Sequence, residues 1–167
     1  MSSSTSSSAS APSRSLRAVA DYRFLDEWRL PADVERVYDL VARPLEYPRW
    51  WGEVFLAAEG DGGEAAPGKR VTVKARGFLP YRIRFTMTCL EADRPYRIHS
   101  RLEGDFEGTG TWLLSEENGG THAQLDWRPS VRKPLVRYLT PVLRPLFRAN
   151  HTWTMERGLH SALRVLE

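Results

Sequence analysis

The amino-acid sequence predicts an α+β fold in which a strongly curved antiparallel sheet of about six or seven strands wraps around a long C-terminal helix. Segments that alternate apolar and polar side chains recur between turn signals from residue 54 to residue 127. Each has one apolar and one charged face, so the apolar face of the sheet must be covered. The helical pattern over 134–166 is the one segment long enough to cover it.

The chain is expected to begin with a disordered tail, followed by a single domain. Residues 1–19 are rich in serine and carry no apolar run, which is typical of a disordered segment, although they also weakly resemble an organelle transit peptide. Residues 20–167 have the length of one domain. Its first strand is predicted over 22–30, and the side chains on the inner face of that strand are Tyr22, Phe24, Asp26, Trp28 and Leu30.

Two short helices are predicted after this strand. Pro31 permits a helix to start, and Pro44 interrupts it. The aromatic segment LEYPRWWGEV then follows as a short helix or loop. The apolar stripe of the first helix, over 33–42, consists of Val34, Val37, Tyr38 and Val41.

Six further strands follow, with turn signals between them. The runs GDGGEAAPG, DRP and NGG are rich in the residues that form turns. Gly108 and Gly110 indicate a bulge or strong bend, and Pro129 is expected to end strand pairing. The predicted strands cover residues 54–58, 70–76, 81–90, 96–102, 106–114 and 121–127.

The C-terminal segment is predicted to form two helices. Pro141 and Pro145 break or kink the first part, because proline lacks a backbone donor. The apolar stripe changes sides around Asn150, which one straight surface helix would not do. We therefore expect a short helix over about 134–147, a change of direction near residue 148 and a longer helix to the end.

Charge and composition exclude several classes of protein. The net charge is +3, with 24 basic and 21 acidic residues, but residues 128–167 hold eight basic and only two acidic ones. No nucleic-acid-binding motif accompanies this basic segment, so nucleic acid is not an expected partner. One cysteine excludes an internal disulfide, and the four histidines lack zinc-site spacing, so no metal or cofactor is expected. Without an apolar run of 18 residues or a secretory signal, the protein is expected in the cytoplasm.

The apolar face of the sheet has two interpretations. Aromatic residues on inner strand faces are usually ordinary core, but an aromatic wall with a few polar groups is also typical of a small-molecule cavity. The candidate ligand-binding residues are Trp28, Tyr81, Phe85, Met87, Tyr96, Ile98, Ser100, Trp112, Trp127, Met155 and Leu159.

Two residues could carry acid–base chemistry. His151 lies on the inward helix stripe with Met155 and Leu159, where an imidazole could exchange protons with a ligand or lock the helix to a strand. Asp26 is the acidic residue of an inner strand face, so it either pairs with a base such as His151 or is exposed. Asn150 is expected to cap or bridge backbone at the bend. Gly158 is expected to leave room for a ligand, Trp112 or a strand backbone.

Several segments resemble a known family. These are LPADVERVYDLV, EYPRWWGEV, EGTGTWLL, THAQLDWRPSV and KPLVRYLTPVLRPLFRANHTWTMERGLHSAL. Together they are similar to the START-like (SRPBCC, helix-grip) superfamily, in its polyketide cyclase/dehydrase-like branch. The resemblance implies the helix-grip fold and a deep apolar cavity between sheet and C-terminal helix. It does not imply one function, because the superfamily hosts many.

Three functions remain open. The first is binding of a small hydrophobic ligand that is polyketide-, aromatic- or lipid-like, with cyclase or dehydratase activity on it. The second is a non-catalytic lipid or quinone carrier, which contacts an anionic membrane through the basic and apolar segment 131–148. The third is a co-chaperone-like interaction module. The sequence does not predict the oligomeric state.

Overall fold

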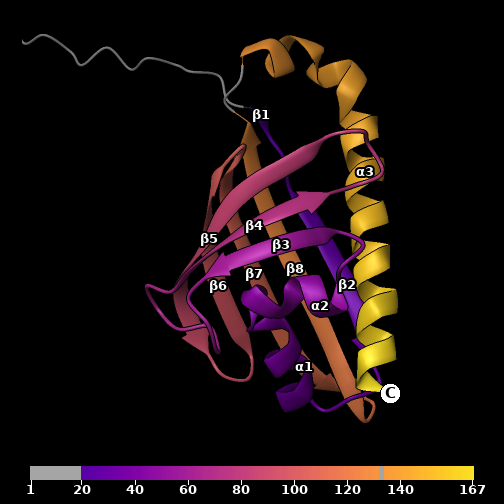
Figure 1. The fold of residues 1–167 in the computed structure, drawn as a ribbon. Helices are drawn as coiled ribbons and strands as arrows, with labels where there is room; N and C mark the ends of the chain where they lie inside the picture. Colours follow the sequence, from indigo (N-terminus) through magenta and orange to yellow (C-terminus); the bar gives the residue numbers. More distant parts are fainter. Residues whose placement is uncertain (1–19, 132–133) are drawn as a thin grey trace, which may run out of the picture.

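A computed structural model of the chain describes residues 20–131 and 134–167 and forms one curved antiparallel sheet with a long helix along its concave side (Figure 1). The predicted tail, 1–19, lies outside the described residues. The strands are β1 (Ala20–Asp21), β2 (Phe24–Leu30), β3 (Phe55–Gly60), β4 (Arg70–Arg76), β5 (Arg82–Asp93), β6 (Arg97–Gly104), β7 (Glu107–Glu117) and β8 (Gly120–Val131).

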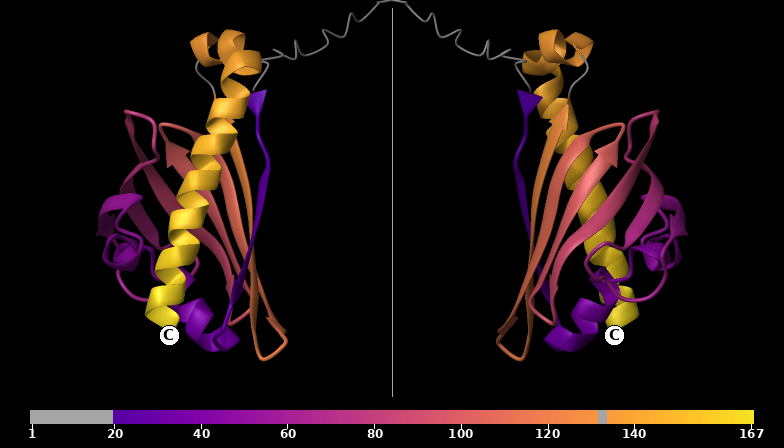
Figure 2. Two further views of the ribbon diagram at one scale, coloured as in Figure 1. Left: turned by 90° about the vertical axis from the view of Figure 1, so that its right-hand side faces the viewer. Right: turned by 90° about the vertical axis from the view of Figure 1, so that its left-hand side faces the viewer.

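The sheet follows chain order from β3 to β8 and ends on the first strands. Its order is β1-β8-β7-β6-β5-β4-β3, and β2 also pairs with β8, so β1 and β2 share one edge position. In that pairing Trp28 lies opposite Ala123. The two side views show how the sheet curls around α3 (Pro134–Leu166) (Figure 2). This is the predicted helix-grip architecture.

Three short helical segments connect β2 to β3 and lie at the end of the sheet where the C-terminus lies (Figure 1). They are α1 (Val34–Val41), the 3-10 helix η1 (Pro44–Glu46) and α2 (Tyr47–Trp50). Asp33 caps α1, because its carboxylate accepts the Arg36 backbone N–H at 2.9 Å. The predicted apolar stripe of α1 is buried.

The predicted end of pairing at Pro129 is wrong, and of the bulge or strong bend predicted at Gly108 and Gly110 the bulge is absent. Strand β8 does not stop at Pro129 but runs on to Val131. A proline lacks only the donor, and its carbonyl still accepts the Tyr22 backbone N–H at 3.1 Å. Gly108 causes no register shift with either neighbouring strand; a side chain there would overlap the Arg128 carbonyl oxygen.

The predicted pair of C-terminal helices is also wrong in part. Helix α3 is continuous from Pro134 to Leu166, although its first turns run at an angle to the rest (Figure 1). Proline removes one helical hydrogen bond and bends a helix without having to end it. The change of direction is therefore present inside one helix rather than between two.

An aromatic core holds α3 against the sheet and the short helices. Trp51 packs edge-on to Trp28 with ring centroids 5.4 Å apart, and Trp28 lies 5.2 Å from Trp112. The Trp51 indole Nε1 donates to the Thr154 carbonyl of α3 at 3.1 Å. Buried aromatic side chains contribute large apolar areas, so this cluster anchors the helix.

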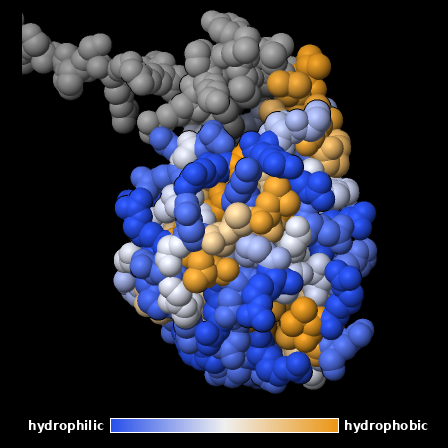
Figure 3. Space-filling view, viewed as in Figure 1, coloured by the Kyte–Doolittle hydropathy of each residue, from blue (hydrophilic) through white to orange (hydrophobic). Residues whose placement is uncertain are grey.

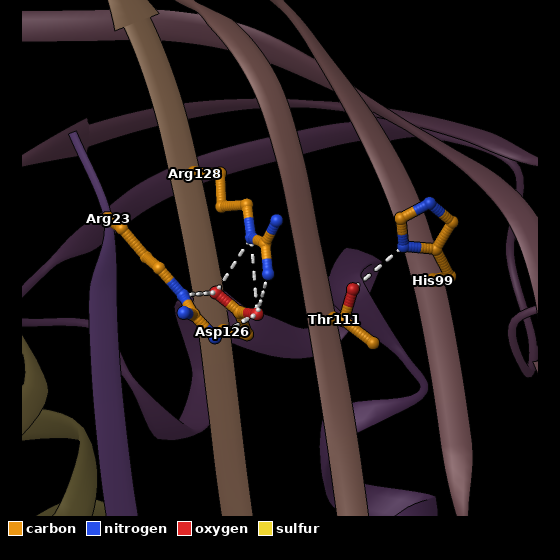
Figure 4. A network of polar contacts seen from close by, with 5 residues as sticks. All are labelled: Arg23, His99, Thr111, Asp126 and Arg128. Atoms are coloured by element: carbon orange, nitrogen blue, oxygen red, sulfur yellow. Dashed lines mark hydrogen bonds and ion pairs between the residues drawn. The ribbon is translucent and has the colours of Figure 1, made fainter. Parts of the chain in front are cut away.

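The convex face of the sheet is polar, as the alternation predicts. Asp126 of β8 accepts hydrogen bonds from Arg23 and Arg128, while His99 bonds Thr111 on the neighbouring strands (Figure 4). The hydrogen bonds from Arg128 lower the pKa of Asp126 to about 2. These residues lie on the face away from α3 and do not take part in the site described next.

Candidate functional site

A cavity of about 690 Å³ lies between the concave face of the sheet and α3. This volume is within the usual range of small-molecule sites, roughly 300–1,000 Å³. In the space-filling view, hydrophobic residues lie within a hollow whose rim is largely hydrophilic (Figure 3). The alternation along the strands explains the apolar wall, because it sends every second side chain inward.

Most of the predicted ligand-binding residues line this cavity. They come from the strands and from α3, so the topology brings together side chains that are far apart in sequence. The predicted residues that line the cavity are Tyr81, Phe85, Met87, Ile98, Ser100, Trp112, Trp127, His151 and Met155.

Three predicted ligand-binding residues do not line it. Trp28 is only 3% exposed and belongs to the aromatic core, further along β2 than the cavity. Tyr96 lies in the turn before β6, where its N–H bonds the Asp93 carbonyl, and its side chain is 49% exposed. Leu159 packs against the core beyond Met155. The alternation of apolar and polar residues predicts on which face of the sheet a side chain lies, but not whether its position along the strand is beside the cavity or in the core.

His151 and Asp26 form a close pair across the seam between α3 and β2. The His151 Nε2 and Asp26 Oδ2 atoms are 2.6 Å apart, and the His151 side chain is 9% exposed against 20% for Asp26. The alternative in which Asp26 is simply exposed is therefore wrong. Against an ionised carboxylate, which can only accept, a neutral imidazole donates from Nε2 and keeps Nδ1 as its basic nitrogen.

The His151 ring lies between the cavity and a smaller hollow. It stacks on Trp127 with centroids 4.7 Å apart and lies 4.3 Å from Phe24. Asp26 does not line the large cavity; it lines a hollow of about 240 Å³ at the β2–α3 seam, which His151 also borders. The carboxylate thus holds the imidazole from outside while the ring contributes to the cavity wall.

The two predicted structural residues of α3 have other partners than expected. Asn150 bridges backbone, but in the β4–β5 turn rather than at a helix end, because its Oδ1 accepts the Leu79 N–H at 3.3 Å. Gly158 makes room for Trp51 and Trp28. A Cβ there would lie 2.4 Å from the Trp51 ring. The sequence predicts a ligand, Trp112 or a strand backbone beside Gly158, and none of these is its neighbour.

One wall of the cavity was not predicted from the sequence. Tyr47, Trp51, Val54 and Phe55 line it from α2 and the start of β3. Tyr47 donates its hydroxyl to the Val41 carbonyl at 2.6 Å, and burial raises its pKa. The aromatic density of EYPRWWGEVF was the available signal, since four aromatic residues in ten seldom face solvent together.

Three further polar groups of the cavity wall are distinctive. The Tyr22 hydroxyl is buried and bonds no other group in the described part of the chain. Cys89 lies in the wall, and burial raises the pKa of its thiol. Burial also raises the pKa of Tyr81. With a raised pKa, the Cys89 thiol and the Tyr81 hydroxyl stay neutral near pH 7, which suits an uncharged ligand surface.

Residues 20–131 and 134–167 contain neither a metal-binding cluster nor a membrane-spanning helix. No group of three histidine, cysteine or acidic side chains there could hold a metal ion. No helix in the same residues is long and apolar enough to cross a membrane. Of the predicted membrane segment 131–148, residues 132–133 and the side chains up to 141 lie outside what the structure describes.

Comparisons with known proteins agree with this architecture. The family model for polyketide cyclase/dehydrase and lipid transport proteins matches residues 11–167. No curated protein matches the chain. The protein TTHA0849 from Thermus thermophilus is 23% identical with a TM-score of 0.70, covering 87% of this chain and all of that one.

Two solved aromatase/cyclases have the same fold. The di-domain aromatase/cyclase BexL from the BE-7585A biosynthetic pathway is 19% identical with a TM-score of 0.69, covering 88% of this chain and 50% of its own. The ZhuI aromatase/cyclase from Streptomyces sp. R1128 is 14% identical with a TM-score of 0.66, covering 87% of this chain and 93% of that one. At these identities the likeness concerns the fold.

Proposed function

Because the chain belongs to the polyketide cyclase/dehydrase and lipid transport family, we propose that it binds a small polyketide-, aromatic- or lipid-like molecule in the cavity between the sheet and α3. The observation that carries this proposal is the 690 Å³ aromatic-lined volume, which the folded side chains leave unfilled. Protein interiors are otherwise close-packed, and an unfilled apolar volume of this size costs stability. A ligand that fills it recovers those contacts.

The polar groups of the wall would orient such a ligand. Ser100 offers a hydroxyl on β6 that can donate to a ligand carbonyl. Phe85 and Trp127 would contact the flat faces of an aromatic ligand.

Acid–base catalysis by His151 is the activity that the geometry supports best. Asp26 fixes the Nε2–H of the imidazole, which leaves Nδ1 to accept a proton. Ring closure by an aldol step removes a proton from the carbon beside one carbonyl, forms a carbon–carbon bond and turns a second carbonyl into a hydroxyl. The imidazolium gives this proton to the new alkoxide oxygen, which completes the hydroxyl. Loss of water then takes a second proton from the same carbon and delivers it through the imidazole to the departing hydroxyl. One imidazole can do both, with no net oxidation or reduction.

A second candidate is a carrier that exchanges its ligand at a membrane. The specific observation in its favour is the exposure of apolar side chains on α3 close to the cavity. Val142 is 77% exposed and Leu146 is 38% exposed, while Phe147 next to them lines the cavity. A carrier needs no proton transfer, so in this case His151 and Asp26 would serve only to join α3 to β2.

Native mass spectrometry of the purified protein, followed by extraction, tests the binding proposal. We expect an added mass that is lost on denaturation, and an apolar compound with aromatic or acyl character in the extract. A protein that retains only its own mass after incubation with candidate polyketides and lipids would refute the proposal. That result, together with a co-purifying chaperone, would favour the interaction module.

The catalytic and carrier candidates are separated by variants of the pair. With the extracted compound as substrate, His151→Asn is expected to keep binding but to lose turnover, if His151 moves protons. Asp26→Asn retains a side chain of the same shape and is expected to lower turnover less. Unchanged conversion in both variants, or no conversion by the wild type, would favour the carrier.

A further inference from the structure

The tip of the β4–β5 hairpin exposes apolar side chains beside the cavity. Phe78 is 46% exposed and Tyr81 is 43% exposed. The tip lies against α3 (Figure 1), where Val142 and Leu146 are also exposed. Burial is described for residues 22–130 and 142–167, and four of the nine large hydrophobic side chains exposed among them thus gather at one end of the molecule. Exposed apolar patches of this kind mark interaction surfaces.

Basic side chains stand directly behind this apolar tip. In the pairing of β4 with β5, Arg76 lies opposite Arg82 and Lys74 lies opposite Arg84. Like charges that face each other across antiparallel strands destabilise the sheet. Arg84 forms an ion pair with Glu59, but in the described residues no acidic side chain pairs with Lys74 or Arg82. The hairpin therefore keeps an unneutralised basic flank, which favours an anionic partner.

The hairpin tip and α3 are fixed to each other. The Leu79 N–H donates to Asn150 Oδ1 at 3.3 Å, and Gly77 packs so closely that a Cβ would lie 2.0 Å from the same oxygen. Leu146 and Val142 lie one and two turns before Asn150 on the same side of the helix. The apolar residues of the tip and of α3 consequently form one face rather than two independent segments.

We propose that this face docks on an anionic lipid surface. The apolar tip, Phe78 to Tyr81, enters the boundary between headgroups and acyl chains, while Lys74, Arg76 and Arg82 contact the lipid phosphates. Residues that line the cavity, among them Gly77, Tyr81 and Phe147, then face the membrane. The arrangement fits lipid because apolar and basic groups are layered along the hairpin in the order in which a bilayer presents acyl chains and phosphates.

This inference rests on the second proposed function, the carrier, and changes its contact surface. The sequence assigned membrane contact to the helical segment 131–148 alone. Here the main contact is a β-hairpin that was not predicted from the sequence to touch a membrane, with α3 contributing Val142 and Leu146. Docking does not require a ligand, so the two proposals can fail separately.

Co-sedimentation with vesicles tests the inference. The full chain is mixed at low salt with vesicles of phosphatidylcholine containing phosphatidylglycerol, or of phosphatidylcholine alone. We expect binding to the anionic vesicles only. Phe78→Ser is expected to weaken it about tenfold. Lys74→Gln combined with Arg82→Gln is expected to weaken it about thirtyfold, since each basic residue near such a surface contributes about one kcal/mol.

Matched controls come from the same chain. Val165→Ser removes an equally exposed apolar side chain (50% exposed) at the opposite end of α3. Arg49→Gln combined with Arg70→Gln removes the same charge from exposed positions away from the tip. Both controls are expected to bind within about twofold of the wild type. If Phe78→Ser does not fold, the charge variants decide the matter alone.

Four outcomes would overturn the inference. These are no binding by the wild type, equal binding to both kinds of vesicle, equal losses in the control variants, and a wild-type dimer that Phe78→Ser converts to a monomer without any vesicle binding. The last would make the face a contact between two copies. A protein that binds vesicles but holds no molecule in native mass spectrometry would refute the cavity proposal only. A ligand-bearing protein that ignores vesicles would refute the docking only.

Discussion

Replacing Gly158 by alanine should destabilise the protein, although the same change in an exposed helix would stabilise it. Alanine exceeds glycine in helix propensity by about 1 kcal/mol. At Gly158, however, the new Cβ would lie 2.4 Å from Trp51 ring atoms and 2.9 Å from Trp28. Trp51 cannot swing away, because its Nε1 bonds the Thr154 carbonyl and its ring packs on Tyr47 and Phe55.

The expected magnitude follows from these opposing effects. Overpacking a well-filled core typically costs about 1–3 kcal/mol, which exceeds the gain in propensity. We expect a net loss of about 1–2 kcal/mol, or a Tm lowered by about 3–6 °C in a chain of this size. Urea unfolding followed by circular dichroism gives the free energy, and calorimetry gives Tm.

A control and a rescue variant make this prediction specific. His160→Ala changes an exposed residue two positions along α3 and should be neutral or slightly stabilising. In a Trp51→Phe background the clashing atoms of the indole are gone, so Gly158→Ala should cost less than in the wild type. If Gly158→Ala stabilises the wild type as His160→Ala does, the close packing of α3 on Trp51 is refuted.

Three further predictions concern the pair, the convex face and the hairpin. Asp26→Ala leaves His151 without its hydrogen-bond partner, so it should lower the free energy of unfolding by about 1–3 kcal/mol, and Asp26→Asn should lower it by less. Urea unfolding measures both changes, and equal losses in the two variants would contradict the pair. Because the pKa of Asp126 is lowered to about 2, its carboxylate contributes about 1 kcal/mol of stability above pH 4, and this contribution is lost as the pH falls toward 2. The stability of Asp126→Asn, measured against pH, should not show this loss. An identical pH profile in the two proteins would count against the Arg23–Asp126–Arg128 contact. Gly77→Ala should lower the free energy of unfolding by about 1–2 kcal/mol, because the new Cβ displaces Asn150 from Leu79. In an Asn150→Ala background, thermal unfolding should show a smaller loss for the same substitution.

The fold could be predicted from the sequence because its signals are local and repeated. Alternation assigns the long strands, and the Val34–Val41 stripe places α1 against the core. The exact ends were less predictable. Pro129 was expected to stop β8, but the proline carbonyl still accepts a hydrogen bond from Tyr22, a residue more than 100 positions away. A pairing partner so distant in sequence cannot be predicted from the local pattern of residues.

The sequence predicts which side chains lie on the concave face of the sheet, but not which of them border the cavity and which fill the core. Phe24 and Trp28 have the same inward orientation on β2, yet Phe24 borders the cavity and Trp28 fills the core. The difference depends on what α2 and the residue after it bring against each of them, and Trp51 covers Trp28. For the same reason the neighbours expected for Gly158 were wrong. Three-dimensional packing between distant elements decides both.

Binding of an apolar aromatic probe to cavity variants is the most direct test of the central claim, that the cavity holds a small hydrophobic ligand. Gly110 lines the cavity, where a side chain would reach toward Trp127, whereas Ser115 on the same strand faces solvent. In fluorescence titrations with a naphthol, we predict saturable one-to-one binding to the wild type and to Ser115→Val. Gly110→Val should bind at least about tenfold more weakly, since one or two extra methyl groups in a pocket cost this much. Equal affinity in all three proteins, or none in the wild type, would contradict the account.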